Sequence, residues 1–268
     1  MLKESGFTLL GMVVILAVLA ILAAVAVPSI FRSVLLSREN TTQLELKEIE
    51  KAIMGVPKLR TYGYVGDMGR FPNTLEELNT QGAQPGWATS GNFLSVGMGW
   101  RGPYIDKDFT SDEYLQDDWN TPYVLTSTYY SGQDSTVARV QSCGPDKQPD
   151  TEDDYFSDVM ILKGNIRLIV SLGMTDNVPR SVTTDLYYAD DGEECTIPLH
   201  GDIVTLQGEH GFWSYVGIGP VHHGVHGLMV HVGAIIEVVI LNVTGGIANE
   251  CWVAIPVGGP GGGGKPTK

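Results

Sequence analysis

Basic residues are scarce in this chain of 268 residues. The sequence holds 17 Lys and Arg against 31 Asp and Glu, which gives a formal net charge of −14. Because a nucleic-acid surface requires Lys and Arg to neutralise phosphates, this composition argues against a nucleic-acid partner. No Lys or Arg occurs between Arg180 and Lys265, an unusual gap for the surface of a domain. The length leaves room for a long helix and two small domains.

The common catalytic motifs and a rich cysteine framework are also missing. The sequence has no Gly-x-Ser-x-Gly, no His-Glu-x-x-His and no phosphate-binding loop, which favours a protein that is not an enzyme. Of the three cysteines, Cys195 and Cys251 could pair in an oxidising compartment and leave Cys143 unpaired. The alternative is free thiols packed as small hydrophobic groups.

One run without charge stands at the N-terminus, from Phe7 to Phe31. As a helix it would be about 37 Å long, enough to span a bilayer. A secretory signal peptide has its cleavage site after the apolar stretch, whereas the Gly6-Phe7 junction precedes it. This arrangement resembles the class III signal of bacterial type IV pilins and pseudopilins. The resemblance implies that a prepilin peptidase cuts after Gly6 and methylates Phe7; the alternative is an ordinary single-pass anchor.

Two positions within the apolar run bear on this resemblance. Pro28 falls on a proline that pilin-like proteins often carry, and it would kink the helix or leave one carbonyl unpaired. Gly11 stands where most pilins have a glutamate, whose carboxylate pairs with the terminal amine of a neighbouring subunit. Subunits that lack this glutamate are typically minor ones at a filament tip.

Helical periodicity continues beyond the apolar run. Leu46, Ile49 and Ile53 recur at spacings of three and four residues, while charged side chains face elsewhere. Gly55 then ends the pattern. The sequence therefore predicts one helix over residues 7–54, half in lipid and half packed on a globular head.

Three aromatic motifs follow in order: Arg70–Leu78, Gly99–Ile105 and Asp117–Tyr123. In the first, Asn73 or Thr74 could cap a short helix that has Glu76 or Glu77 in its first turn. The order of the three resembles the major pseudopilin of type II secretion. That family has a Tyr-Pro-Thr-Thr-like helix start, a Trp-x-Gly-Pro-Tyr turn and an Asp-Pro-Trp-Gly-Asn-Pro-Tyr hairpin entry.

An acidic segment comes next, with five acidic residues in the nine positions 146–154. Crowded carboxylates repel one another unless a cation neutralises them, and calcium takes six to eight hard oxygen ligands. The segment is not an EF-hand, but it resembles the calcium loop of the major pseudopilin. That resemblance implies three carboxylate ligands and two backbone carbonyl ligands: Asp146, Asp153 and Asp154, with Cys143 and Gln148. The alternative is a solvated acidic turn.

The family ends near this loop, so the remainder is an addition. Short Val/Ile-rich segments predict β-strands at sandwich-like spacing, at 166–170, 202–206, 227–232, 235–241 and 252–257. The Gly- and Pro-rich tail predicts disorder. The expected organisation is a leader (1–6), a helix (7–55, with 7–31 transmembrane), a head (56–160), a β domain (161–257) and a tail (258–268).

All six histidines lie between His200 and His231. His222, His223 and His226 sit in a Gly-punctuated turn, close enough in sequence to share a transition metal. The favoured interpretation is a surface loop whose charge responds to mild acid.

Together these features predict an α+β protein: a long N-terminal transmembrane and filament helix packed on a small antiparallel-sheet pilin head, followed by an all-β, sandwich-like domain. The resemblance implies a structural subunit of a periplasmic pseudopilus or type IV pilus-like filament serving type II secretion, anchored in the inner membrane by a single pass. It implies as partners copies of the chain, other pilin-like subunits, a prepilin peptidase, and an assembly platform and ATPase in trans. Three alternatives stay open: a minor or tip subunit, an adhesive or ligand-binding pilin, and a membrane-tethered metal-dependent enzyme.

Overall fold

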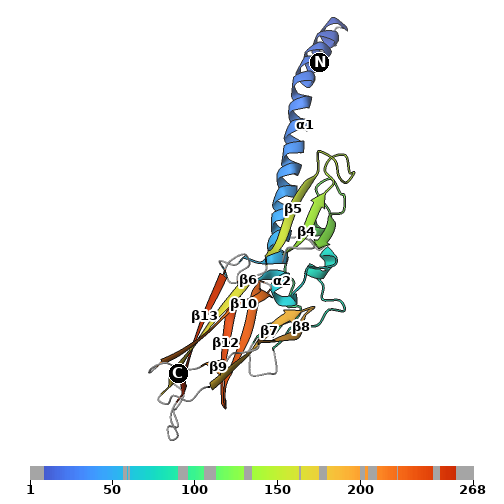
Figure 1. Ribbon diagram of the computed structural model, residues 1–268. Coiled ribbons are helices and arrows are strands. Elements are labelled where there is room, and N and C mark those ends of the chain that lie inside the picture. Colours follow the sequence, from blue (N-terminus) through green and yellow to red (C-terminus); the bar gives the residue numbers. More distant parts are fainter. Residues whose placement is uncertain are drawn as a thin grey trace, which may run out of the picture.

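The computed structural model describes these residues: 9–56, 59, 61–89, 96–105, 113–129, 135–162, 164–174, 180–199, 203–204, 210–221, 223–243 and 248–257. Gly6, Phe7, His222 and the tail 258–268 lie outside them. The molecule is elongated, with a long helix projecting from one end, a small sheet beside the base of that helix, and a β domain at the opposite end (Figure 1).

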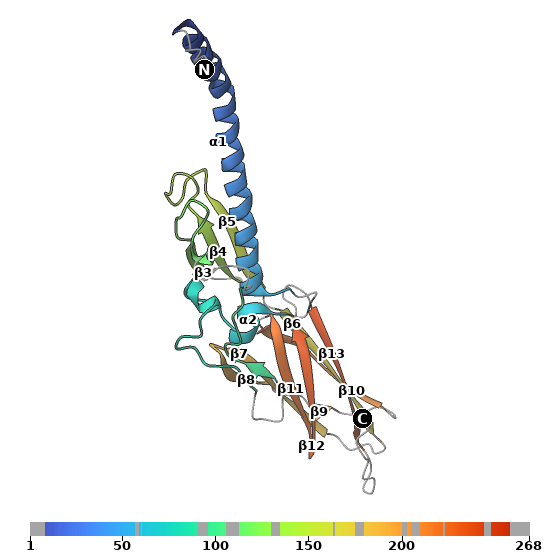
Figure 2. The same cartoon turned by 180° about the vertical axis from the view of Figure 1, so that it is seen from behind.

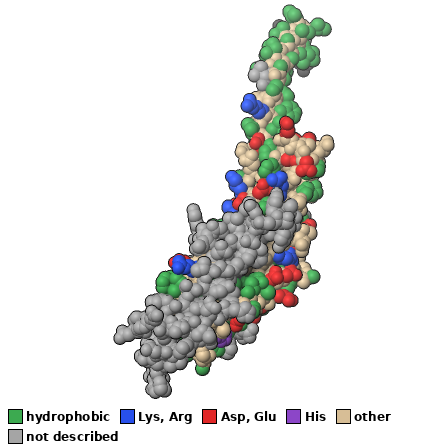
Figure 3. Space-filling view, in the orientation of Figure 1, with side chains coloured by type: hydrophobic (Ala, Val, Ile, Leu, Met, Phe, Trp, Pro, Cys, Tyr) green, Lys and Arg blue, Asp and Glu red, His purple; other side chains and the backbone are tan. Residues whose placement is uncertain are grey.

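Helix α1 (Leu9–Met54) confirms the long helix predicted from the sequence. Its N-terminal part presents exposed Leu, Val and Ile side chains, which Figure 3 shows as a hydrophobic surface. Among the described helices it is the one that is long and apolar enough to cross a membrane. The helix continues through Pro28, whose ring nitrogen cannot donate a backbone hydrogen bond. Thus α1 fits a single-pass membrane anchor.

The C-terminal part of α1 packs on the head. Leu46, Ile49 and Ile53 are buried there, as their spacing predicted. The packing surface is an antiparallel sheet of three strands in the order β3-β4-β5: β3 (Val124–Tyr129), β4 (Ser135–Ser142) and β5 (Tyr155–Leu162). Its inner face contributes Ala138, Val140 and Val159 to the same core.

Short elements complete the head: α2 (Gly63–Met68), η2 (Leu75–Leu78), β1 (Ala88–Thr89), β2 (Gly97–Met98) and η3 (Glu113–Leu115). The short helix predicted near Asn73 is a single 3-10 turn, η2. Thr74 is its N-cap residue, but the Thr74 side chain makes no capping bond. Instead Glu77, in the first turn as predicted, accepts hydrogen bonds from the backbone N–H and the side-chain amide of Asn73, each at 3.1 Å.

The C-terminal domain is a β-sandwich, as predicted. Its strands are β6 (Gly164–Met174), β7 (Arg180–Asp190), β8 (Glu193–Leu199), β9 (Ile203–Val204), β10 (His210–Val221), β11 (Gly224–Val232), β12 (Ile235–Val243) and β13 (Ala248–Val257). One sheet has the order β10-β6-β13, with β13 parallel to β6; the other has the order β12-β11-β7-β8, with β9 paired to β7. Both sheets contribute to one apolar core cluster.

The sandwich is docked on the head through α2 and the turn between β7 and β8. The Gly192 N–H donates to the Met68 carbonyl (2.8 Å), and Arg70 pairs with Asp191. Gly69 has φ +76, and a Cβ added there would lie 2.0 Å from the Ala189 carbonyl oxygen, so this approach requires glycine. A small apolar cluster joins Val96 and Met98 of the head to three sandwich side chains: Tyr187, Ala189 and Met229. The two parts therefore meet in a packed contact.

Candidate metal centre in the acidic loop

The acidic loop connects the end of β4 to the start of β5. A turn at Gly144–Lys147 begins it, and Gly144 has φ +61 with the Asp153 carbonyl oxygen 2.2 Å from where a Cβ would stand. A side chain at this position would separate the two arms of the loop. Asp150 and Lys147 also have positive φ values, 66° and 60°, and Asp tolerates this conformation better than most residues. Local backbone geometry thus folds the loop back on itself.

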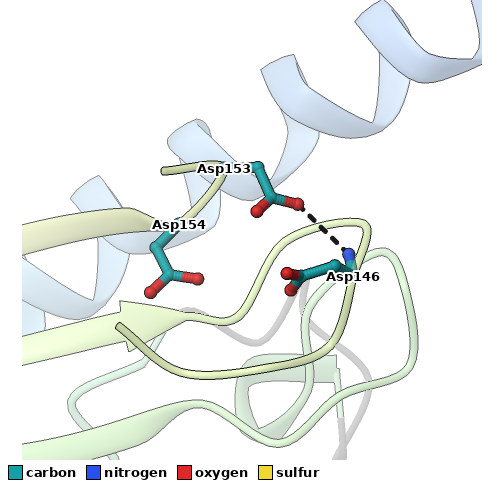
Figure 4. Close-up of side chains that lie close together, drawn as sticks. All are labelled: Asp146, Asp153 and Asp154. Carbon is teal, nitrogen blue, oxygen red and sulfur yellow. Dashed lines mark hydrogen bonds between the residues drawn. The ribbon is translucent and has the colours of Figure 1, made fainter. Parts of the chain in front are cut away.

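The fold brings the three predicted carboxylates together. Single oxygens of Asp146, Asp153 and Asp154 lie within 4.8 Å of one another. Figure 4 shows the three side chains converging, with the Asp146 N–H donating to Asp153 Oδ2 at 3.2 Å. No other group of three or more His, Cys, Asp or Glu is placed this way in the described part of the chain. The three residues are distant by up to eight positions in sequence, so the loop itself creates the cluster.

Neighbouring groups orient each carboxylate. The Gln148 N–H donates to Asp146 Oδ1 (2.8 Å), and the Thr151 hydroxyl donates to Asp153 Oδ1 (2.9 Å). Asp154 Oδ2 accepts from the Gln141 side-chain amide (2.6 Å) and from the Thr151 N–H (3.0 Å). A carboxylate offers about four lone-pair sites, so these bonds leave acceptor capacity for a cation.

The two residues predicted to supply carbonyl ligands lie in the same loop. The Gln148 carbonyl oxygen lies 3.2 Å from the Thr151 hydroxyl oxygen, and Cys143 is buried directly after β4. Their roles as ligands stay predictions. The donor set of hard carboxylate and carbonyl oxygens suits Ca²⁺ better than a soft metal.

Two titratable groups of the loop have shifted pKa values. The hydrogen bond from the Thr151 hydroxyl lowers the pKa of Asp153 below its usual value. Burial, together with the charges of nearby aspartates such as Asp154 and Asp117, raises the pKa of the Cys143 thiol. At neutral pH the Asp153 carboxylate is therefore ionised, and the Cys143 thiol is neutral.

Asp117 supports the loop and was not singled out as a site residue from the sequence. Its carboxylate is 4% exposed and accepts three hydrogen bonds, from the Ser142 hydroxyl (2.6 Å) and the N–H groups of Trp119 (3.0 Å) and Thr121 (2.8 Å). Ser142 is the last residue of β4. Its hydrogen bond to Asp117 therefore connects the third aromatic motif, Asp117–Tyr123, to the start of the acidic loop. The sequence signal for this role was the Asp-x-Trp-x-Thr spacing, because an Asp side chain can accept hydrogen bonds from backbone N–H groups two and four residues later.

The histidine turn differs from the prediction. His223 and His226 are 4% and 3% exposed, so they do not form a surface loop. His223 Nε2 lies 3.0 Å from the Met54 carbonyl at the end of α1, and its ring packs edge-on against Tyr62. Burial lowers the pKa of His223. His223 thus serves the contact between head and sandwich, whereas the ring of His226 lies 6.4 Å from that of Tyr188 within the sandwich. The third histidine, His222, lies outside the described residues.

The disulfide considered for Cys195 and Cys251 is not formed. All three cysteines are described and are free thiols. Cys195 lies on β8 and Cys251 on β13, which belong to different sheets of the sandwich. The alternative of separately packed thiols matches the structure.

A long apolar helix packed on a small antiparallel sheet defines a pilin-like protein, here extended by a β-sandwich. Residues 30–160 match the family described as Type II secretion system (T2SS), protein G. The type II secretion system core protein G of Dickeya chrysanthemi is 27% identical over 158 residues, which cover 57% of this chain and 84% of that protein. The core protein G of Pectobacterium carotovorum subsp. carotovorum is 25% identical over 158 residues, covering 57% and 83%. No solved structure matches the chain.

Proposed function

We propose that this chain is a pseudopilin, a structural subunit of a periplasmic filament serving type II secretion, and not an enzyme. The observation that carries the proposal is the match of residues 30–160 to protein G of that system, on a chain whose helix α1 has an exposed apolar N-terminal part. Exposed apolar helix surface is stable in a bilayer or in a bundle of like helices. The subunit would leave the inner membrane and pack through α1 with copies of itself and other pilin-like subunits, driven by a platform and ATPase in trans.

Processing by a prepilin peptidase belongs to this proposal. Cleavage between Gly6 and Phe7 would leave an apolar N-terminus that continues into α1 two residues later. The intact mass of the chain purified from cells with and without the peptidase tests this step. A Gly6→Val variant should keep its leader, whereas the neighbouring Ser5→Ala variant should lose it. An unprocessed wild-type chain in peptidase-containing cells would contradict the proposal.

Calcium binding by the acidic loop is the second part. Asp146, Asp153 and Asp154 would hold the ion, with the carbonyls of Cys143 and Gln148. A ligand that binds only the folded state stabilises it by about 2.7 kcal/mol at a hundred times its Kd. Thermal unfolding of the detergent-solubilised chain should therefore shift upward with Ca²⁺ relative to a chelator.

Matched variants separate calcium binding from general charge. Asp153→Asn should abolish the calcium-dependent shift, while Glu152→Gln removes a carboxylate from the same loop outside the cluster and should retain the shift. If the wild-type chain unfolded at the same temperature with Ca²⁺ and with chelator, the metal site would be refuted. The loop would then be interpreted as a solvated acidic turn.

The place of the subunit in the filament is a narrower question. Gly11, in place of a glutamate, together with the bulky sandwich favours a minor or tip subunit over the filament shaft. Replacing Gly11→Glu should change incorporation, measured as copies per filament. An unchanged copy number and position in the filament would show that Gly11 does not determine the place of the subunit.

A further inference from the structure

The sandwich has one edge strand that differs from its other edges. The long edge strands β8, β10 and β13 each contain a proline, at positions 198, 220 and 256. Proline and charge on an edge strand discourage pairing with a further strand. The remaining edge strand, β12, contains no proline, Lys or Arg, and Glu237 is its single charge. Among these long edge strands, β12 is thus the one without proline, and a single glutamate is its only charged residue.

The structure shows that β12 has a full ladder on one side. All nine of its residues pair antiparallel with β11, seen side by side in Figure 2. Among the described residues no strand pairs with its other side. A nine-residue strand with unpaired backbone N–H and C=O groups along one side is a template for an added strand.

The side chains of β12 add apolar surface beside that edge. Leu241 and Val243 face the sandwich core, whereas Ile236 and Ile240 point to the outer face and are 52% and 50% exposed. Between them, Val238 packs against the cluster that holds Met229. An added strand with apolar residues at alternate positions would cover both isoleucines and extend this cluster.

Charge indicates which strand would fit. Residues 181–264 contain nine Asp and Glu and no Lys or Arg. A second copy of the same sandwich would bring like charge to this edge, whereas a segment carrying Lys or Arg would be attracted to it. From the edge, the exposed isoleucines and this charge we propose that β12 is a strand-addition site for an extended, cationic segment of another protein. This role goes beyond filament packing through α1 and does not depend on calcium.

A labelled peptide with three Val-Thr repeats between two Lys pairs provides the probe, with full-length protein in detergent as the target. Fluorescence anisotropy should show saturable binding, at least tenfold tighter than that of the same peptide with proline at its two central positions. The two peptides carry equal charge. Equal affinities would therefore mean that the peptides bind by charge attraction without strand pairing, which would overturn the proposal.

Variants of equal charge locate the site. Replacing Ile236→Asn and Ile240→Asn together should weaken binding about tenfold. Trp252→Asn, which removes a 64% exposed side chain on β13 of the other sheet, should leave it unchanged. The reverse pattern would overturn the assignment to β12, as would self-association of the chain that the Ile variants abolish.

Hydrogen exchange keeps the test decisive if the double variant does not fold. In the wild-type chain the bound peptide should slow exchange of β12 amides while β8 and β13 amides remain unchanged. Protection confined to β8 or β13 would refute the site.

Discussion

The head and the sandwich are stabilised by different kinds of contact. The sandwich core is a continuous apolar cluster in which Leu168, Leu186 and Leu228 are fully buried. The head core contains apolar side chains too, but buried polar groups run through it, among them the carboxylates of Asp67 and Asp117. The head therefore combines volume filling with directional bonds.

This difference explains where the candidate sites lie. Apolar packing is non-directional and tolerates exchange of side chains with similar volume. A buried carboxylate, by contrast, fixes the groups that donate to it, because an unsatisfied buried donor is costly. The acidic loop, which needs defined oxygen positions, is attached to the head through Asp117 and Ser142. The proposed partner site on the sandwich needs only a strand edge and apolar surface.

The largest expected effect tests the apolar nature of the sandwich. Leu186→Ala removes a fully buried side chain and should lower the free energy of unfolding by about 3–4 kcal/mol, whereas Leu186→Met should cost less than about 1.5 kcal/mol. Denaturant unfolding with hydrogen exchange of sandwich amides measures both. If both variants lowered the free energy of unfolding equally, the stability of this core would depend on side-chain shape and not on side-chain volume.

A slightly smaller effect tests the polar nature of the head. Asp117→Ala leaves the Ser142 hydroxyl and two backbone N–H groups without their acceptor and should cost about 2–3 kcal/mol. The adjacent Asp118→Ala, for a partly exposed carboxylate, should stay within about 0.5 kcal/mol. The denaturant midpoints of the two variants measure this difference. If Asp117→Ala had no effect on stability, the contrast between the two regions would be wrong.

A third prediction uses pH. Burial raises the pKa of Asp67 from 3.8 to about 6, although the Arg101 guanidinium, with Nε 3.2 Å away, opposes the rise. The native state then binds this proton more tightly than the unfolded chain, so the contribution is complete below about pH 4 and is lost as pH rises through 6. The loss is of order 2–3 kcal/mol.

Asp67→Asn isolates this contribution. The free energy of unfolding of the wild type minus that of the variant should fall between pH 4 and 6 and level off above. Denaturant unfolding at a series of pH values measures the difference. A difference that stays flat with pH would show that Asp67 is ionised throughout and that Arg101 offsets its burial.

The smallest effect concerns the contact between the two regions. Asp191 pairs with Arg70 but its side chain is 74% exposed, so Asp191→Ala should lower stability by less than about 1 kcal/mol. Glu193→Ala in the same turn, an exposed carboxylate, should have no measurable effect. A loss of several kcal/mol on Asp191→Ala, measured by thermal unfolding, would mean that this one pair holds the regions together.

A local sequence pattern was sufficient for the long helix, and the family resemblance was sufficient for the acidic cluster. The spacing of Leu46, Ile49 and Ile53 reports a buried helical face directly. Asp146, Asp153 and Asp154 lie on one short loop, so few arrangements separate them. The strands β7, β8 and β10 were not predicted, because Thr, Asp, Glu, Gly and Pro interrupt their apolar patterns and only neighbouring strands make them extended.

Three features follow from the amino-acid sequence alone: a membrane-competent helix, a head similar to protein G of type II secretion, and an acidic loop. Each of them can be recognised from local periodicity, from composition or from the order of motifs. Three other features follow from the folded structure: His223 is buried against the end of α1, Asp117 supports the loop, and β12 is an edge without a further partner among the described strands. These are contacts between residues far apart in the chain, and their energies depend on burial and pairing that no local pattern specifies.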